Sequence, residues 1–180
     1  PRVLIDVMTE LIKPQLGDKC FDPACGTFGF MIAANRYVNA HNDMYALSDR
    51  QADFQQNKAF NGVELVHETH RLALMNAYLH NMNANITLGD SLAQSAKGLK
   101  DFDVILTNPP FGTKKGGERA TRDDISFQTS NKQLNFLQVI YRSLKADGKA
   151  RCAVVLPDNV LFAAGDGASV RRELMNFCNL

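Results

Sequence analysis

Apolar and polar positions follow two periods along the chain, one typical of helices and one typical of short buried strands. Helical spacing predicts helices over residues 2–12, 30–38, 67–82, 134–144 and 168–178. Short runs of β-formers predict strands over residues 19–22, 63–65, 86–88, 104–107 and 152–156. Because strands alternate with helices, the pattern predicts an α/β fold with a doubly wound, mostly parallel sheet flanked by helices.

Two polar stretches interrupt this alternation. Residues 39–60 are rich in Asn and Gln, which predicts a surface excursion that contains some helix. Residues 112–131 form a second long polar segment, and a segment of this kind without structure of its own is usually functional or disordered. Within the helix predicted over residues 67–82, four apolar side chains fall on one face at helical spacing. They are Leu72, Met75, Leu79 and Met82.

The strand predicted over residues 104–107 runs into the loop Asn108-Pro109-Pro110-Phe111. Neither proline can donate to a sheet, and each disfavours helix in the residue before it, so the chain leaves the sheet as a stiff, extended loop. In an open α/β sheet, ligands bind at the carboxyl ends of the strands. The loop is therefore a candidate ligand site. The alternative is a proline-terminated strand with Phe111 as a hydrophobic anchor.

The first predicted strand leads into a turn of small residues that ends at Gly29. Gly26 and Gly29 allow the backbone to approach a ligand closely, and Asp22 can accept hydrogen bonds from a ligand or order the loop. The spacing is G-x-x-G rather than G-x-G-x-x-G, so the sequence gives poor support for a dinucleotide.

Acidic residues also follow the next two strands. A carboxylate at the end of the second strand could accept both hydroxyls of a ribose. Asp49 and Glu64 compete for this role, and Glu64 is favoured because an amphipathic helix follows it directly. Asp90, after the third strand, could accept from the exocyclic amine of an adenine, although an N-cap or turn is its alternative role. Together with Asp22 and the loop at Asn108, these acids predict a nucleoside-shaped cofactor with a substrate beside it.

Composition narrows the class of protein. The chain has 180 residues, is 45% hydrophobic and carries a formal net charge of +1, which suits one globular domain and indicates no particular partner. Its four cysteines form no C-x-x-C pair, which argues against a zinc site and favours reduced thiols in a cytoplasmic protein. No apolar run is long enough for a membrane span. The chain begins with Pro1 rather than Met, and we expect it to be incomplete at both ends.

Two motifs in this order, DPACGTFGF over residues 22–30 and NPPF over residues 108–111, resemble the cofactor and catalytic motifs of S-adenosylmethionine-dependent adenine-N6 DNA methyltransferases. More narrowly, the chain resembles the catalytic domain of the methylation (M) subunit of type I restriction-modification systems. Further matching segments lie at residues 62–64, 74–76, 79–80, 135–137, 154–157 and 171–174. The resemblance covers nearly the whole chain.

The resemblance implies a Rossmann-like methyltransferase domain over residues 1–180 that binds S-adenosylmethionine and no metal. The implied cofactor-binding residues are Asp22, Gly26, Thr27, Phe28, Gly29, Glu64 and Asp90. The implied catalytic residues are Asn108, Pro109, Pro110 and Phe111. Since the family usually has a small residue at the position of Phe28, we expect its ring to narrow the methionine pocket. The implied partners are duplex DNA with a flipped adenine and separate specificity and restriction subunits, without a membrane.

In the implied mechanism, the Asn108 side-chain oxygen and the Pro109 carbonyl accept the two N6 hydrogens of adenine, while Phe111 stacks on the extruded ring. Four basic residues are candidates for phosphate contacts, although acidic neighbours leave a solvated loop as the alternative. They are Lys114, Lys115, Arg119 and Arg122.

Three alternatives stay open at this point. His67 and His70 could bind a metal, but the sequence offers no third ligand, and a polar helix face is the better interpretation. The chain could methylate RNA or a glutamine side chain, because the same loop suits any planar amine. It could also be a scaffold that binds cofactor without chemistry.

Overall fold

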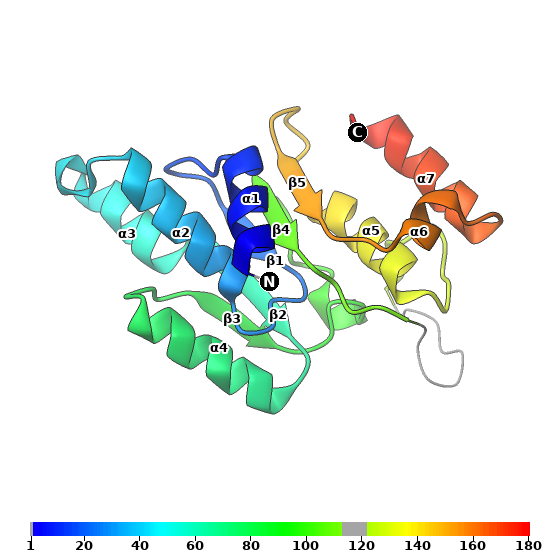
Figure 1. Cartoon of the computed structure of the whole chain (residues 1–180), viewed down its shortest axis with the longest axis horizontal. Helices are drawn as coiled ribbons and strands as arrows, with labels where there is room; N and C mark the ends of the chain where they lie inside the picture. The colour runs from blue at the N-terminus through cyan, green and yellow to red at the C-terminus, as the bar shows by residue number, and fades with distance from the viewer. Residues whose placement is uncertain (1, 113–121) are drawn as a thin grey trace.

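The computed structural model describes residues 2–112 and 122–180 and contains a five-stranded sheet in which every pairing is parallel (Figure 1). The strand order is β3-β2-β1-β4-β5, with β1 in the centre. The strands are β1 (Cys20–Asp22), β2 (Phe60–Glu64), β3 (Asn85–Leu88), β4 (Val104–Thr107) and β5 (Arg151–Val154). The sequence-based prediction of a doubly wound parallel α/β sheet is confirmed, and β2 begins three residues earlier than predicted.

Helices follow the strands in the alternation that the sequence predicts. They are α1 (Arg2–Ile12), α2 (Gly29–His41), α3 (Asp49–Asn57), α4 (His67–Leu79), α5 (Lys132–Ser143), α6 (Asp158–Phe162) and α7 (Asp166–Phe177), with short 3₁₀ turns η1 (Met44–Ala46) and η2 (Gln94–Ala96). The predicted excursion over residues 39–60 contains the end of α2, η1 and α3. Within the described ranges, no helix is both long and apolar enough to cross a membrane.

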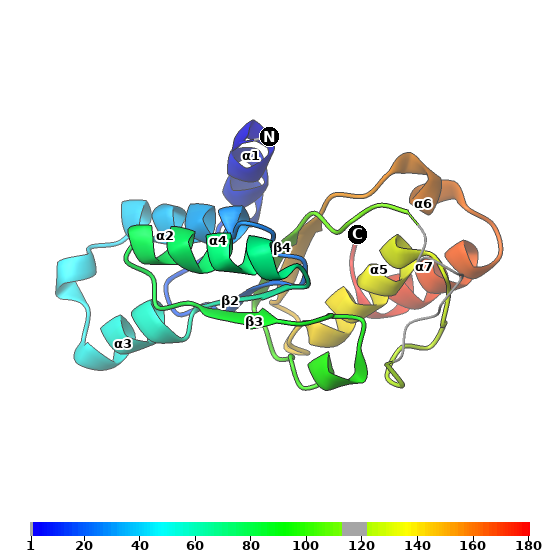
Figure 2. The same ribbon diagram turned by 90° about the horizontal axis from the view of Figure 1, so that it is seen from below.

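Alternate residues of the central strands face opposite layers of helices, as the two-residue period of a strand requires. Cys20, Val104 and Leu106 pack in one hydrophobic cluster with Met8 of α1 and Met31 of α2. Helix α4 joins this cluster, and Figure 2 shows α1, α2 and α4 on the same side of the strands. This face is the larger of the two apolar layers.

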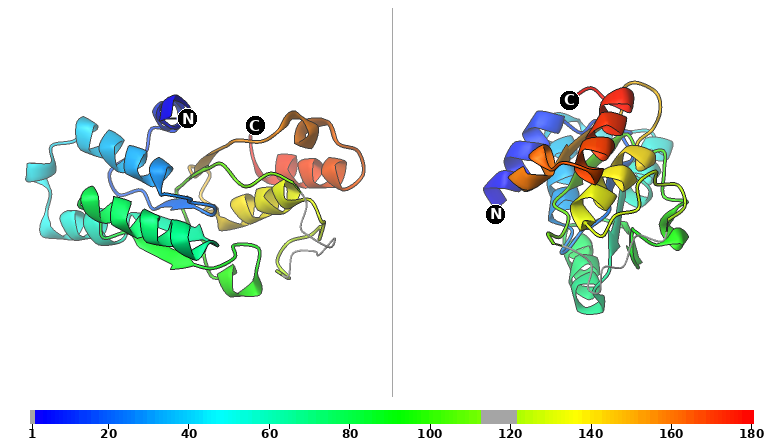
Figure 3. Two further views of the ribbon diagram at one scale, coloured as in Figure 1. Left: turned by 60° about the horizontal axis from the view of Figure 1, so that its bottom comes forward. Right: turned by 90° about the vertical axis from the view of Figure 1, so that its right-hand side faces the viewer.

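The opposite face of the sheet is covered by α5. Phe21 and Ile105 pack there against Ile140 of α5, and the Phe21 ring stacks on Phe102 with centroids 4.3 Å apart. Helix α7 lies against the outer side of α5, where Leu134 and Leu137 meet Val170 (Figure 3). Nearly all of α5 is therefore buried, which fixes the position of the chain that enters it.

The face of α4 that meets the sheet is not the one predicted. Ala73 and Ala77 are buried against the core, whereas Leu72, Met75 and Leu79 are 47%, 51% and 68% exposed. Met82, placed on the same predicted face, is buried beyond the end of the helix. Small side chains allow the helix to lie close to β2 and β3, so its larger apolar side chains point away from the sheet.

Phe28 is fully buried in the main core, and its backbone adopts a left-handed conformation with φ of 71°. Burying such a ring contributes about 2 to 3 kcal/mol. Gly62 of β2 makes room for it: a Cβ there would lie 2.9 Å from Phe28 Cε2 and 2.9 Å from Cys25 Cβ. The turn before α2 is thus held down on the sheet by a ring that needs a glycine beneath it.

We predict that Gly62→Ala destabilises the fold by about 1 to 3 kcal/mol, because the added methyl group forces Phe28 and Cys25 out of place. Gly98→Ala is the matched control, since a Cβ at Gly98 meets nothing within 4 Å. Urea denaturation measures both. Equal losses of unfolding free energy in the two variants would show that the close packing of Phe28 on Gly62 does not make this position more sensitive than Gly98.

Candidate active site at the carboxyl ends of the strands

Parallel pairing brings the ends of neighbouring strands to one edge of the sheet. Asp22 ends β1, Glu64 ends β2, and Thr107 ends β4 directly before Asn108. Asp90 follows β3 by two residues. The structure therefore places the three predicted acids and the Asn108 loop along the same edge, whereas Asp49 lies at the start of α3, away from any strand.

Glu64 is tied to the glycine turn. Its Oε2 accepts a hydrogen bond from the Gly26 backbone N–H at 3.0 Å, and its Oε1 accepts from Val66 N–H at 2.7 Å. Each carboxylate oxygen can accept a second hydrogen bond, so two hydroxyl donors of a ligand could still be bound. Gly26 has φ of 52° and open space where a Cβ would lie, which leaves its backbone accessible from outside.

The exposed part of the turn is steadied by α4. Thr27 is exposed at its surface, and its carbonyl accepts a hydrogen bond from the Asn76 side chain at 3.0 Å. Gly29 begins α2, and a Cβ there would lie 3.1 Å from Ile5 of α1. The turn is thus fixed from two helices as well as from Glu64.

Asp22 is 1% exposed, and its Oδ1 accepts from the Ala24 N–H at 3.0 Å. Burial raises the pKa of this carboxyl to about 7, and the Thr107 hydroxyl partly offsets that effect. Asp22 therefore organises the turn from below. Its burial places it behind the turn rather than on the accessible surface.

The expectation for Phe28 was wrong. Its ring lies in the core among Cys25, Phe30 and Met31 and has no exposed surface, so it points away from the accessible edge. A methionine pocket is therefore not narrowed by this side chain. The ring takes this position because the left-handed φ of Phe28 directs its side chain into the core. A glycine at the same position would have no side chain there.

Asp90 shapes the chain after β3. Its Oδ1 accepts from the Leu92 N–H at 2.8 Å, which is the turn role that the sequence left open. The next residue, Ser91, is 3% exposed and donates its hydroxyl to the Pro23 carbonyl at 2.6 Å. The segment after β3 is thus joined to the turn after β1. The sequence carried no signal for this contact, because the two residues are 68 positions apart.

The acceptor loop, residues 108–111, is exposed where the predicted chemistry needs it. Asn108 and Pro110 are exposed, Phe111 is 58% exposed, and Pro109 between them is buried. The alternative in which Phe111 is a core anchor is therefore wrong. Pro109 anchors the loop instead, while the amide and the ring beside it face solvent.

Gln133 of α5 holds the far end of this loop and was not singled out from the sequence. It is 3% exposed. With the amide oriented to satisfy both of its groups, Oε1 accepts from Gly112 N–H at 2.6 Å and Nε2 donates to Asn131 Oδ1 at 2.7 Å. The Lys132 N–H also donates to the Gly112 carbonyl at 3.2 Å. Gly112, with φ of 105°, is thus fixed on the start of α5.

Arg122 does not fit the predicted phosphate role. Its side chain is 1% exposed and pairs with Asp124, with Nη2 2.6 Å from Oδ2 and Nε 2.8 Å from Oδ1. The guanidinium beside Asp124 lowers the pKa of that carboxyl. The other three candidates, Lys114, Lys115 and Arg119, lie outside the described residues.

His67 of α4 is exposed, and His70 is half-buried. The His70 ring lies with Nε2 2.9 Å from the Ile86 carbonyl, a contact that joins the helix to β3. Among the residues that the structure describes, no group of three or more His, Cys, Asp or Glu side chains could hold a metal ion.

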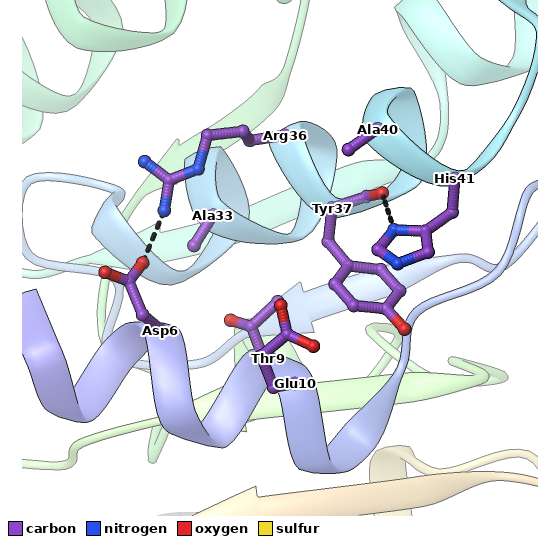
Figure 4. Close-up of a pocket in the computed structure, with 8 residues that line it drawn as sticks. All are labelled: Asp6, Thr9, Glu10, Ala33, Arg36, Tyr37, Ala40 and His41. Atoms are coloured by element: carbon purple, nitrogen blue, oxygen red, sulfur yellow. Dashed lines mark hydrogen bonds and ion pairs between the residues drawn. The ribbon is translucent and has the colours of Figure 1, made fainter.

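A hollow of about 240 Å³ lies elsewhere, between α1 and α2 (Figure 4). Its lining residues are Asp6, Thr9, Glu10, Ala33, Arg36, Tyr37, Ala40 and His41. Arg36 pairs with Asp6, and the His41 ring stacks on Tyr37 with centroids 4.0 Å apart. None of the predicted site residues lines this hollow, so it is separate from the strand-end site.

We predict that Asp22→Asn changes how stability depends on pH. The folded chain keeps a proton on Asp22 up to about pH 7, whereas an unfolded chain loses it near its ordinary pKa of about 4. Wild-type stability should therefore fall as pH rises between these values, by up to about 1.4 kcal/mol per pH unit. Urea denaturation across this window should show Asp22→Asn gaining stability over the wild type as pH rises. Stability curves that run parallel across this pH range in Asp22→Asn and the wild type would contradict the raised pKa of Asp22.

Comparison with known proteins agrees with this geometry. The family model for N-6 DNA methylase matches residues 1–180. The chain is 46% identical over its whole length to the methylase subunits of the type I restriction enzymes StySPI from Salmonella potsdam and EcoKI from Escherichia coli K12. The crystal structure of the EcoKI M protein superposes with a TM-score of 0.90 at 45% identity, covering 97% of this chain and 37% of that one.

The chain spans about a third of the length of these curated relatives, with 35% of each covered. The match nevertheless includes all of the strands and the whole strand-end site. The fold is a Rossmann-like α/β fold with an all-parallel sheet. On the full-length family match, the chain belongs to the N-6 DNA methylase family.

Proposed function

We propose that the chain transfers a methyl group from S-adenosylmethionine to N6 of adenine in DNA, as the catalytic part of a type I restriction-modification methylase. One observation carries this proposal: Asn108 and Phe111 are exposed at the end of β4, on the same sheet edge as Glu64 and the glycine turn. A base acceptor and a nucleoside cofactor would then lie next to each other. The family match supports adenine in DNA over RNA or a glutamine side chain.

The strand-end residues fit such a cofactor. S-adenosylmethionine, when bound, supplies an activated methyl group, so the protein needs only to position the two reactants. Glu64 has acceptor capacity left on both oxygens for the ribose hydroxyls. Gly26 offers an open backbone for the methionine part, and Asp90 would accept from the adenine amine. Asp22, Thr27, Phe28 and Gly29 would act by shaping the turn.

The acceptor loop would activate the adenine amine. Its lone pair is delocalised into the ring, which makes N6 a weak nucleophile. If Asn108 Oδ1 and the Pro109 carbonyl each accept one N6 hydrogen, the nitrogen becomes more tetrahedral and its lone pair can point at the methyl group. N6 held in this way would take up the activated methyl group that the cofactor supplies, and the amine would afterwards lose its proton to solvent. No general base is needed before transfer.

A base inside a duplex cannot reach this loop, so the adenine would be flipped out at a cost of a few kcal/mol. Phe111, with more than half of its surface exposed, could stack on the extruded ring and contribute about 1 to 3 kcal/mol. Stacking would offset much of the flipping cost. Pro110 keeps the ring and the amide of Asn108 at a fixed separation, because proline restricts the backbone between them.

The related methylase subunits belong to type I restriction enzymes, so we propose that this chain also works with separate specificity and restriction subunits. The specificity subunit would choose the DNA site, and the restriction subunit would act on DNA that lacks the methyl group. Since the proposed substrate is DNA, we expect the enzyme to work in the cytoplasm.

Transfer of a labelled methyl group to duplex DNA tests the proposal. The intact enzyme is incubated with radiolabelled S-adenosylmethionine and duplex DNA, and the product is digested to nucleosides. We expect the label in N6-methyladenine. Label in RNA or protein alone would support the alternative substrates, and cofactor binding without any transfer would support a scaffold.

We predict that Asn108→Ala lowers methyl transfer by at least about a hundredfold, because it removes a preorganised hydrogen-bond acceptor at the reacting nitrogen. Cofactor binding should stay within a few-fold of wild type, since Asn108 belongs to the acceptor loop. Asn42→Ala is the matched control, because the Asn42 amide bonds Val38 at the far end of α2. Transfer at the wild-type rate by Asn108→Ala would contradict the mechanism.

We predict that Glu64→Ala weakens cofactor binding by about tenfold to a hundredfold, because it removes a charged acceptor and frees the Gly26 N–H. Asp49→Ala should leave binding unchanged, since Asp49 is exposed on α3. Isothermal titration with S-adenosylmethionine measures both. An unchanged affinity for Glu64→Ala together with a large loss for Asp49→Ala would reverse the assignment.

A further inference from the structure

Arg122 joins two parts of the site that are remote in sequence. Its Nη1 donates to the Ser91 carbonyl at 3.2 Å, while the other two nitrogens of the guanidinium pair with Asp124. Ser91 lies after β3, next to Asp90, and Arg122 follows the acceptor loop. A buried arginine that is paired and hydrogen-bonded through three nitrogens has a fixed geometry. The segment after β3 and the segment at Arg122 are therefore held in fixed positions relative to each other.

The contact at Ser91 continues to the cofactor turn. The Ser91 hydroxyl donates to the Pro23 carbonyl at 2.6 Å, and Pro23 directly follows Asp22. Beneath these polar contacts, Ala24 packs on an apolar cluster that joins all three segments to α5. The cluster consists of Leu92, Ile125, Phe136 and Val139. The turn after β1, the turn after β3 and the segment after β4 are thus one packed unit.

The other end of this unit reaches the acceptor loop through amides of α5. Gln138 bonds the Phe127 backbone at both its N–H and its carbonyl, at 2.9 and 2.7 Å. Asn135 Nδ2 donates to the Thr129 carbonyl at 2.8 Å. Asn135 and Gln138 have no exposed surface, and Gln133 then holds Gly112. Hydrogen bonds joined by short stretches of backbone therefore connect Pro23, through Ser91 and Arg122, to the residue that follows Phe111.

We propose that Arg122 is a positioning residue that couples the cofactor turn to the acceptor loop, an inference that rests on the proposed function. Cofactor contacts at Gly26 would further restrict the motion of the turn, and the Ser91–Arg122–Asp124 contacts would pass this restriction to the loop that takes the adenine. Arg122 touches neither reactant. Its effect is to make binding of cofactor and binding of the flipped base favour each other.

A lysine cannot replace Arg122 in this role. The single ammonium group could pair with Asp124, but it lacks the planar fork that bonds Asp124 through two nitrogens and Ser91 through a third. Arg122→Lys therefore keeps the charge and loses the link. Asp124→Asn is a second variant that keeps the shape of the side chain and removes the charge that holds the guanidinium in place.

The test measures coupling between the two ligands in the intact enzyme. A duplex carries 2-aminopurine at the adenine that the wild type methylates, and its fluorescence reports flipping and affinity with and without S-adenosylhomocysteine. We expect the wild type to bind this duplex on the order of tenfold more tightly when S-adenosylhomocysteine is bound. Arg122→Lys, Asp124→Asn and Ser91→Ala should each lose most of that factor.

Lys97→Ala is the matched control. Lys97 pairs with Asp123 at 2.7 Å and joins the same two segments, but through an exposed contact, so the coupling factor should not change. Urea denaturation shows whether each variant is folded, and a loss of stability without a change in the coupling factor would assign Arg122 a structural role only. That result overturns the inference.

The wild-type measurements separate this inference from the proposed function. If the wild type methylates adenine and Arg122→Lys and Asp124→Asn keep the full coupling factor, the inference fails and the proposed function stands. If the wild type methylates adenine but its coupling factor is near one, the inference likewise fails and the proposed function stands. If the wild type does not methylate adenine, the proposed function fails and the inference falls with it.

Discussion

The parallel pairing of β1 with both β2 and β4 is the constraint on which the site depends. It sets Asp22 beside Gly62 on one side and Phe21 beside Ile105 on the other. The ends of β1, β2 and β4 are then held within two residues of each other along the strand direction. Residues from four separate parts of the chain can meet only because this register is fixed, and the register is fixed because both faces of β1 and β4 are buried.

The sequence predicted this sheet well because its signal is local. A two-residue or 3.6-residue period, and a proline or glycine at many of the boundaries, can be read from neighbours in the chain. The face of α4 could not be read in the same way. Leu72 and Met75 have the stronger apolar signal, but the contact with β2 and β3 selects Ala73 and Ala77. The helical period shows that a helix has apolar faces. Which face is buried depends on the size of the side chains that the neighbouring strands can accommodate.

In the candidate site, too, local sequence position could be used for prediction and tertiary contacts could not. Asp22, Glu64, Asp90 and Asn108 lie at the sheet edge that their strand-end positions predict, because the position itself defines this edge, while their roles toward a ligand stay predictions. Arg122 was misassigned, because charge alone suggests solvent or phosphate, and only the fold brings Asp124 and Ser91 around it. Gln133 gave no signal at all. Its role depends on contact with Gly112, which lies across a long loop.

These differences follow from what each side chain must do. Groups that are proposed to meet a ligand, Asn108 and Phe111, are exposed, so a loop motif reveals them. Groups that hold the loop, such as Gln133 and Arg122, are buried and hydrogen-bonded, since an unpaired buried amide or guanidinium would destabilise the fold. The stiffness of Pro109 and Pro110 could not by itself aim the loop, because a rigid segment needs fixed ends. Pro109 in the core and Gly112 on α5 provide these two ends, and the exposed amide and ring between them gain their orientation from buried neighbours that a motif does not contain.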